Sequence, residues 1–539
     1  MTKPAEPVID KVDGRSLRSG FLASAAAHPQ ATALAVQGVT RTYGELETTA
    51  RIWAQAIGEA LGRRPERVGI FGYRSEVSYA GVLAALFGGA TFVPLNRTFP
   101  PARTRRMIEA ANLDAIIVDQ SSSVQLTEIL KGLRPTPLLL LPENEAREFS
   151  APGRVVLGKS ELAGVSPLAA LPPVIPSDIA YLLFTSGSTG VPKGVPVTHG
   201  NVLHFIDVIT DRYGITPADR FSQTFDQTFD LSVFDLFVAW ERGASVYAMQ
   251  PLELLAPTRF VTRNELTVWF SVPSIPALMR KKGFLKPGGF PSLRLSLFCG
   301  EPLPVASAEA WQQAAPNSIL ENLYGPTELT IACLLHRWDP ERSPALCVNG
   351  MVPIGRPFPG LGAMLLDDDL RPITDGGAGE LCVCGPQTVP GYWQDDAKTA
   401  ERFVSVRVSP SITVRVYRTG DRAARHPSGD YVYLGRVDHQ IKVLGHRVEL
   451  GEIEAALRAD AAVVEAIAVG WPVEEGTAHG IVAFVSGSGI DQGRLLEAVR
   501  AKLPDYMTPR EIRVIDTMPL NPNGKIDRNA LQQRLDGTR

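Results

Sequence analysis

Short apolar strands alternate with helices through the first third of the chain, and this alternation limits the fold more than any other feature. Thr42 and Glu45 form the pattern of a capping box, which marks the start of a helix that continues to Leu61. Strands that are apolar on both faces and joined through helices form a parallel sheet covered on both sides. The sequence therefore predicts an α/β fold, with strands at 67–71, 91–95 and 115–118 and further helices at 77–87 and 103–113.

The pattern changes near residue 435, which indicates a second domain. Short strands at 379–383 and 431–434 precede the change. The order of elements after it is typical of a small α+β domain: a helix at 451–459, strands at 463–469 and 481–485, a helix at 492–503 and a strand at 512–515. We expect a large α/β domain at residues 1–437 and a small domain at residues 438–539, with the boundary at Asp438.

Charge and apolar runs disfavour several classes of protein. The 539 residues include 54 Lys and Arg against 57 Asp and Glu, a net charge of −3, so no basic excess favours nucleic-acid binding. The first ten residues lack the basic and apolar segments of a secretory signal. The longest apolar run, at 79–95, is broken by glycines and a proline and is too short to span a bilayer comfortably. We expect a cytoplasmic protein with neither nucleic-acid nor membrane partners.

An apolar strand at 181–184 runs directly into a loop of glycine, serine and threonine residues that ends in Pro-Lys-Gly. Gly187 and Gly190 let main-chain amides approach an anion, the hydroxyl groups add donors, and Lys193 adds a positive charge. The loop therefore predicts a phosphate site. It lacks the Gly-x-x-x-x-Gly-Lys spacing of a P-loop, which makes a kinase or an ATPase the weaker hypothesis.

Seven motifs, in order along nearly the whole chain, resemble those of adenylate-forming enzymes. This family contains acyl-CoA synthetases, luciferases and the adenylation domains of nonribosomal peptide synthesis. The resemblance implies a large N-terminal α/β domain with doubly wound sheets and a small, mobile α+β C-terminal domain. It also implies two half-reactions: a carboxylate joins the AMP of ATP and expels pyrophosphate, and a thiol then displaces AMP. The motifs lie at residues 89–95, 185–194, 322–328, 379–381, 417–421, 435–442 and 521–525.

By this resemblance, ATP and Mg²⁺ bind along these motifs. Tyr324 would stack on adenine, and Asp421 would accept hydrogen bonds from the ribose hydroxyls, with Arg436 in support. Thr327 would contact the α-phosphate, and Glu328 would bind Mg²⁺, an ion that prefers hard oxygen ligands. The β- and γ-phosphates would be held by the loop residues Thr185, Ser186, Gly187, Ser188, Thr189, Gly190 and Lys193.

The small domain would contribute the catalytic lysine and the hinge. Lys525 resembles the residue that reaches the carboxylate and the phosphates during adenylation, where its charge offsets the charge that develops. Asp438 occupies the family's hinge position, where rotation would withdraw Lys525 and admit the thiol of a pantetheine arm. Gly445 follows in a loop that would line the path of the arm.

Asp230, in Phe-Asp-Leu-Ser-Val-Phe, resembles the residue that pairs with the substrate ammonium in the amino-acid subgroup. A buried carboxylate without a partner is costly, so it would also reject acids that lack the amine. Asp226 is a second candidate that lacks the following serine. The other pocket positions carried over from the family are apolar except for one hydroxyl and one thiol: Leu231, Phe234, Ser274, Leu297, Cys299, Leu323, Ile331 and Ala332.

This wall favours a small or medium neutral side chain. The stretch 297–301 resembles D-alanine–carrier-protein ligases, whereas the leucine-lined pocket resembles prolyl-carrier-protein ligases. The sequence leaves both D-alanine and proline as possible substrates, because one methylene group changes the binding free energy by only about 1–3 kcal/mol. Since no carrier domain is recognisable, we expect a stand-alone unit whose acceptor is a separate carrier protein bearing phosphopantetheine. Coenzyme A carries the same arm, so an acyl-CoA synthetase is the alternative.

Overall fold

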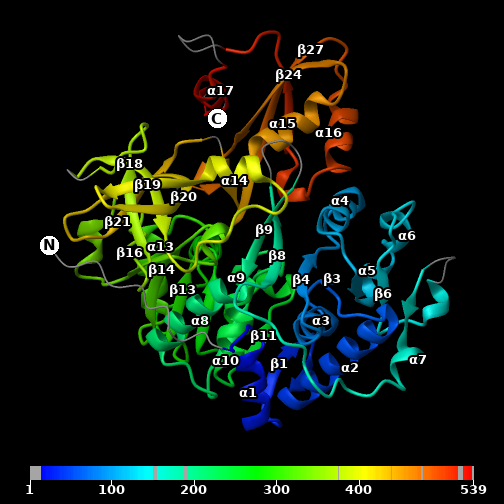
Figure 1. Ribbon diagram of the computed structural model, residues 1–539. Coiled ribbons are helices and arrows are strands. Elements are labelled where there is room, and N and C mark those ends of the chain that lie inside the picture. Colours follow the sequence, from blue (N-terminus) through cyan, green and yellow to red (C-terminus); the bar gives the residue numbers. More distant parts are fainter. Residues whose placement is uncertain are drawn as a thin grey trace.

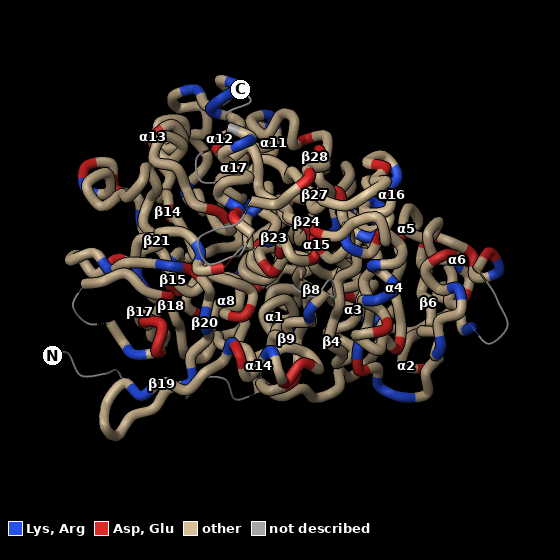
Figure 2. Tube along the Cα trace, turned by 90° about the horizontal axis from the view of Figure 1, so that it is seen from above, with Lys and Arg blue, Asp and Glu red and all other residues tan. Residues whose placement is uncertain are grey.

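The computed structural model describes residues 14–149, 154–186, 192–373, 376–438, 440–474, 477–519 and 526–536. Figure 1 shows a large body, coloured blue to yellow, below a smaller C-terminal part in orange and red. Charges of both signs are interspersed along the chain (Figure 2). In the described part of the chain, no helix is both long and apolar enough to cross a membrane.

The first sheet gathers the apolar strands of the N-terminal third. Its strands run parallel except for the last pair. The strands predicted here are confirmed, and the helices α2 (Tyr43–Leu61), α3 (Glu76–Phe87) and α4 (Pro101–Ala111) lie within two residues of their predicted positions. The order across the sheet is β7 (Val156–Leu157), β6 (Leu138–Leu140), β5 (Ala115–Val118), β3 (Arg67–Phe71), β4 (Thr91–Leu95), β8 (Ile179–Thr185) and β9 (Lys193–Thr198).

The capping box at the start of α2 is formed as predicted. The Thr42 hydroxyl accepts from the Glu45 N–H, and the Glu45 carboxylate accepts from the Thr42 N–H. Tyr43, Leu46, Trp53 and Ile57 then bury one face of the helix. Local hydrogen bonding and the apolar spacing therefore act together to fix this helix on the sheet.

The second sheet places most of the predicted site residues at one edge. Its central strands are parallel, so their carboxyl ends meet. Asp230 follows β10, Ser274 follows β12, Cys299 follows β13 and Thr327 follows β14. The order across the sheet is β16 (Arg356–Pro357), β15 (Leu334–Arg337), β14 (Ile319–Tyr324), β13 (Leu295–Phe298), β12 (Val268–Ser271), β10 (Arg220–Gln223), β11 (Ser245–Ala248), β1 (Thr32–Val36) and β2 (Val39–Thr42).

A third, antiparallel sheet brings together two further predicted residues. Asp421 and Arg436 lie opposite each other on neighbouring strands. The strands predicted at 379–383 and 431–434 are confirmed. The sheet consists of β17 (Gly362–Leu366), β18 (Ala378–Cys384), β20 (Ile412–Arg425) and β19 (Phe403–Ser409), with β21 (Tyr431–Arg436) beside β20.

The residues after 438 form an α+β unit, as predicted. Two hydrophobic clusters consist of residues from this part of the chain alone. The division at residue 438 itself stays a prediction. The elements are the hairpin β22 (Gln440–Val443) and β23 (His446–Glu449), the sheet β24 (Val463–Gly470), β27 (Ile481–Gly487) and β28 (Glu511–Val514), and the helices α15 (Leu450–Arg458), α16 (Gln492–Arg500) and α17 (Arg528–Asp536).

The small domain is held against the large one by buried polar contacts. Arg103 of α4 and Glu452 of α15 form an ion pair at 2.6 Å, with side chains only 4% and 1% exposed. The β22–β23 hairpin reaches the edge of the second sheet, where the Gly445 N–H donates to Glu301 Oε1 at 2.5 Å. This hairpin therefore closes one side of the region in which the site residues gather.

Candidate active site

A cavity of about 360 Å³ lies between the β22–β23 hairpin and the carboxyl ends of the second sheet. Residues of both domains line it, which matches the two-domain site implied by the motifs. Those predicted from the sequence are Thr185, Ser186, Asp230, Leu231, Leu323, Tyr324, Thr327, Asp421, Arg436 and Gly445.

Three residues that line the cavity belong to a chain of hydrogen bonds. The Tyr324 hydroxyl donates to Asp421, whose other oxygen pairs with Arg436 at 2.7 Å. Arg436 also holds both oxygens of Asp438, at 2.6 and 2.8 Å. Burial alone would raise the pKa of Asp438, but Arg436 outweighs it and lowers that pKa to about 2. Asp438 is therefore ionised and paired in this arrangement, and its role as a hinge stays a prediction.

Glu328 is the most tightly held carboxylate of the site. Arg447 of β23 donates to its Oε2 at 2.8 Å, and the Tyr392 hydroxyl donates to its Oε1 at 2.8 Å. The Lys193 ammonium lies 3.6 Å from the same Oε1. Burial alone would raise the pKa of Glu328, yet Arg447 and Lys193 hold it below its ordinary value. The candidate metal ligand is thus neutralised here by an arginine of the small domain.

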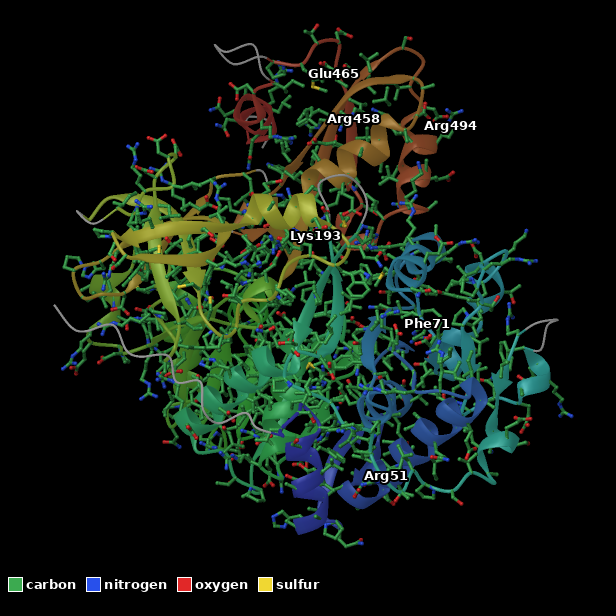
Figure 3. All side chains as sticks on the ribbon, in the orientation of Figure 1. Arg51, Phe71, Lys193, Arg458, Glu465 and Arg494 are labelled. Atoms are coloured by element: carbon green, nitrogen blue, oxygen red, sulfur yellow. The ribbon has the colours of Figure 1, made fainter. Side chains whose placement is uncertain are left out.

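The described part of the phosphate loop offers donors toward the cavity. Thr185 Oγ1 is buried without a hydrogen-bond partner among the described residues, and such an atom is costly unless a ligand satisfies it. The Ser186 hydroxyl donates to the Arg447 carbonyl oxygen at 2.8 Å. Burial lowers the pKa of Lys193 to about 8. Figure 3 labels Lys193 where the large body meets the small domain.

Five predicted residues lie outside the described residues: Gly187, Ser188, Thr189, Gly190 and the catalytic candidate Lys525. Their roles stay predictions.

Asp230 also lines the first cavity. Its Oδ2 accepts from the Ile331 N–H at 3.1 Å, and the nearby Thr327 side chain lowers its pKa. Burial nevertheless raises its pKa to about 6. The rival candidate Asp226 instead accepts from Asn96 and Thr228 and lines a different cavity. Of the two candidates, Asp230 is thus the one that lines the first cavity, and its role toward a substrate stays a prediction.

The remaining predicted wall residues separate into two groups. Ser274 lines the second cavity, where its N–H donates to Glu301 Oε2 at 2.8 Å. The charged residues Glu301 and Lys442 border the first cavity and were absent from the predicted wall. The other members are packed in the hydrophobic core around the site: Phe234, Leu297, Cys299, Ile331 and Ala332.

A second cavity of about 790 Å³ adjoins the first. Phe229, Gly445, His446 and Tyr506 line both cavities. The His446 ring stacks on Tyr506 with 3.7 Å between ring centroids and meets the edge of Phe229 at 4.7 Å. A long, thin group that enters through the second cavity would therefore pass Gly445 and these rings before it reached the first.

Sequence reasoning missed several residues that complete the site. Arg447 and Tyr392 bind Glu328, although 119 and 64 positions separate them from it along the chain. Arg447 lies just beyond a recognised motif, and Tyr392 lies in Gly-Tyr-Trp. The motif before Arg447 and the Gly-Tyr-Trp sequence could have drawn attention to these two residues. Their pairing with Glu328 could not be predicted, because a single sequence does not show contacts between distant segments.

Comparison with known proteins gives matches over nearly the whole chain. The profile of AMP-binding enzymes matches residues 21–393, and that of the AMP-binding enzyme C-terminal domain matches residues 452–525. An L-proline–[L-prolyl-carrier protein] ligase of Streptomyces coelicolor is 35% identical over 91% of this chain and 91% of its own length.

Two further matches concern adenylation domains and larger synthetases. The crystal structure of the Vibrio cholerae adenylation domain AlmE in complex with glycyl-adenosine-5′-phosphate has a TM-score of 0.86 and 31% identity, and covers 99% of this chain and 100% of its own. A probable non-canonical nonribosomal peptide synthetase of Salinispora arenicola is 34% identical over 95% of this chain, which spans 6% of that protein.

Proposed function

The chain belongs to the family of AMP-binding enzymes and has the adenylate-forming fold, and on this premise we propose that it activates a small or medium neutral amino acid. The carboxylate of the amino acid attacks the α-phosphate of ATP, an aminoacyl-AMP forms, and pyrophosphate leaves. A phosphopantetheine thiol of a separate carrier protein then attacks the acyl carbon, a thioester forms, and AMP leaves with the thiol proton passing to solvent or to a base.

The observation that carries this proposal is the Asp230 carboxylate at the first cavity. It is buried, and the Ile331 N–H that it accepts from leaves acceptor capacity for a further partner. An ammonium group would supply the missing positive charge, whereas an acid without an amine would leave the carboxylate poorly compensated. Leu231 and Leu323 beside it favour a neutral side chain.

The relatives support the same substrate class. One bears the name of an L-proline ligase, and the other was crystallised with a glycyl adenylate. Both amino acids are small and neutral. We therefore keep glycine, alanine and proline as the leading substrates.

The second cavity supports a pantetheine arm as acceptor. It reaches Gly445 at the boundary of the first cavity, and its lining combines apolar side chains with polar and charged ones such as Asn96, Thr98 and Lys281. Coenzyme A ends in the same arm, so this geometry fits an acyl-CoA synthetase equally well. The carrier-protein ligase of Streptomyces coelicolor favours a carrier protein, and a direct comparison of both acceptors decides between them.

Mg²⁺ fits Glu328 as one ligand among several. Among the described residues no group of three or more His, Cys, Asp and Glu side chains could hold a metal ion alone. The protein would contribute the Glu328 oxygen, and phosphate and water oxygens would complete the shell, which is common for Mg²⁺. When bound, the ion would offset the negative charge of the phosphates.

The ion pair between Glu328 and Arg447 supports the proposal that the two half-reactions use different domain arrangements. An arginine at 2.8 Å already neutralises the carboxylate that would hold Mg²⁺. Two cations at one carboxylate repel each other, so adenylation favours an arrangement from which Arg447 is withdrawn. We therefore assign the described arrangement, with Gly445 between the two cavities, to thiol transfer, and the rotated one to adenylation.

Pyrophosphate exchange tests the proposal. The purified protein is incubated with ATP, Mg²⁺ and labelled pyrophosphate, with glycine, both alanine enantiomers, L-proline and the other proteinogenic amino acids in turn. We expect exchange with at least one small neutral amino acid. Exchange that depends on fatty or aryl acids but on no amino acid would contradict the proposal. Loading of a phosphopantetheinylated carrier protein, compared with coenzyme A, then identifies the acceptor.

A further inference from the structure

The loop that follows Glu328 has an unusual backbone. Thr330 and Ile331 both lie in the left-handed region, with φ of 58° and 69°. Branched side chains disfavour this region strongly, so two consecutive cases require that the surroundings hold the loop in place. Both residues are buried, at 0% and 1% exposure.

The side chain of Gln387 provides that restraint. The two N–H groups of its Nε2 are shared among the carbonyl oxygens of Leu329, Thr330 and Ala332, at 3.1, 3.2 and 2.7 Å. The Thr330 hydroxyl donates to the main-chain carbonyl oxygen of Gln387 at 2.7 Å. One fully buried amide thus binds the loop on both sides of Ile331.

The hydrogen-bonding partners of the Gln387 amide fix its orientation. Three carbonyl oxygens can only accept hydrogen bonds, so the amide nitrogen must face them. The amide oxygen then faces Nδ1 of His204 in α8 (His199–Tyr213) at 3.1 Å. The segment around Gln387 is held in turn, because the Asn201 side chain donates to the Pro386 carbonyl oxygen at 2.6 Å.

The restrained loop meets the substrate site at Asp230. The Ile331 N–H points at Asp230 Oδ2 as a consequence of the left-handed conformation of the loop. Ile331 and Ala332 also pack around the site as part of the hydrophobic core. Gln387 itself lines neither cavity. Its influence on substrate binding therefore passes through the loop.

We propose that Gln387 is a positioning residue for amino-acid recognition: it holds the loop at 329–332 so that the Ile331 N–H orients the Asp230 carboxylate toward the substrate amine. This inference rests on the proposed function, because it concerns the amine site of that function. It assigns to a buried glutamine outside the pocket a part in selecting amino acids over acids without an amine.

The test compares Gln387→Leu with Gln312→Leu. Gln312 is a matched control, because its amide also donates to two backbone carbonyl oxygens, of Ala315 and Ser318, in a different part of the large domain. Pyrophosphate exchange is measured with the best amino acid of the wild-type panel and with its des-amino analogue, and KM is determined for the amino acid and for ATP.

For Gln387→Leu we expect the KM for the amino acid to rise roughly tenfold or more, the scale of losing buried hydrogen bonds, with the KM for ATP within about twofold. Preference over the des-amino acid should fall. The apparent pKa of Asp230 in kcat/KM should rise, because the ionised carboxylate loses its backbone donor. Gln312→Leu should change none of these quantities.

Equal changes in both KM values, or a result that matches the Gln312→Leu control, would overturn the inference. If Gln387→Leu does not fold, His204→Leu replaces it, because that variant keeps the Gln387 amide but removes the partner of the amide oxygen. The KM for the amino acid should again rise more than the KM for ATP, by a smaller factor. If the KM for the amino acid does not rise selectively in His204→Leu, the inference is overturned as well. Failure of the proposed function is distinguishable, because the wild type would then show no exchange with any amino acid.

Discussion

Two buried carboxylates around the first cavity differ in how they are held. Glu328 pairs with Arg447 of the small domain, and nearby Asp421 is linked through Arg436 to Asp438 at the domain boundary. Asp230 instead accepts a hydrogen bond from the Ile331 N–H of the large domain.

This difference indicates which contacts of the site a rotation of the small domain can change. A movement of the small domain must break or remake the pair between Glu328 and Arg447. It leaves the hydrogen bond between Asp230 and Ile331 intact. We therefore expect variants at Arg447 and Lys525 to separate the two half-reactions, and variants around Asp230 to change which acid is accepted.

Lys525→Ala should give the largest separation. Loss of a donor at the reacting phosphate should slow adenylate formation by about 10²–10³-fold. Transfer from a preformed adenylate should slow much less. Single-turnover assays of each half-reaction measure both effects, and Lys502→Ala, which removes an exposed lysine of the same domain, is the control. Equal losses in both half-reactions would show that Lys525 has a structural role.

Arg447→Met should act in the opposite direction. The transfer arrangement loses a buried ion pair, although Lys193 and Tyr392 still hold Glu328, so carrier loading should slow by about 10- to 100-fold. Pyrophosphate exchange should be retained and should reach half its maximum at a lower Mg²⁺ concentration, because Arg447 no longer occupies Glu328 Oε2.

The matched control is Arg103→Met, which breaks a second buried ion pair between the domains. It should slow loading without changing the Mg²⁺ dependence. An unchanged Mg²⁺ dependence in Arg447→Met would separate this arginine from the metal site and remove the basis for the two arrangements.

Acid should weaken binding of the amino acid at Asp230. Burial, with a smaller contribution from Glu328, raises the pKa of Asp230 to about 6, although Ile331, Thr327 and Lys442 oppose the rise. Below that pH the free enzyme carries a neutral Asp230, which cannot pair with an ammonium group. The kcat/KM for the amino acid should fall about tenfold per pH unit below pH 6, whereas kcat/KM for ATP should not follow this profile. A flat profile between pH 5 and 7 would contradict the assignment.

Ser274→Ala should have the smallest effect. The hydroxyl lies at the second cavity, and the bond to Glu301 Oε2 that fixes the backbone comes from the Ser274 N–H. We expect kcat/KM for the amino acid to stay within about twofold, the usual range for a change away from the site. A change of substrate preference would place this hydroxyl in the amino-acid pocket after all.

The helices and strands were predicted well from the sequence, because each depends on residues that are close together along the chain. The capping box of Thr42 and Glu45, the alternating apolar strands and the C-terminal order of helices and strands are all found in the structure. Most of the predicted nucleotide residues that the structure describes also gather at one cavity, because their motifs lie at strand ends that meet there.

The rest of the site depends on contacts between distant segments. Nothing local marks Arg447 as the partner of Glu328, or Gln387 as the residue that restrains the loop around Ile331. The left-handed backbone at Thr330 and Ile331 is also unexpected from the sequence, since branched residues disfavour it and glycine is absent there. These features become visible only when the sheets and the small domain are assembled.

The measurement that tests the central claim most directly compares an amino acid with its des-amino analogue in the wild type and in Asp230→Ala. For alanine against propionate, or proline against cyclopentanecarboxylate, the variant should lose about 30- to several-thousand-fold in kcat/KM for the amino acid, from the roughly 2–5 kcal/mol of a buried charge pair. The des-amino acid should lose far less. A wild type that prefers the des-amino acid, or a selective loss in Asp226→Ala instead, would contradict the account and favour an acyl-CoA synthetase.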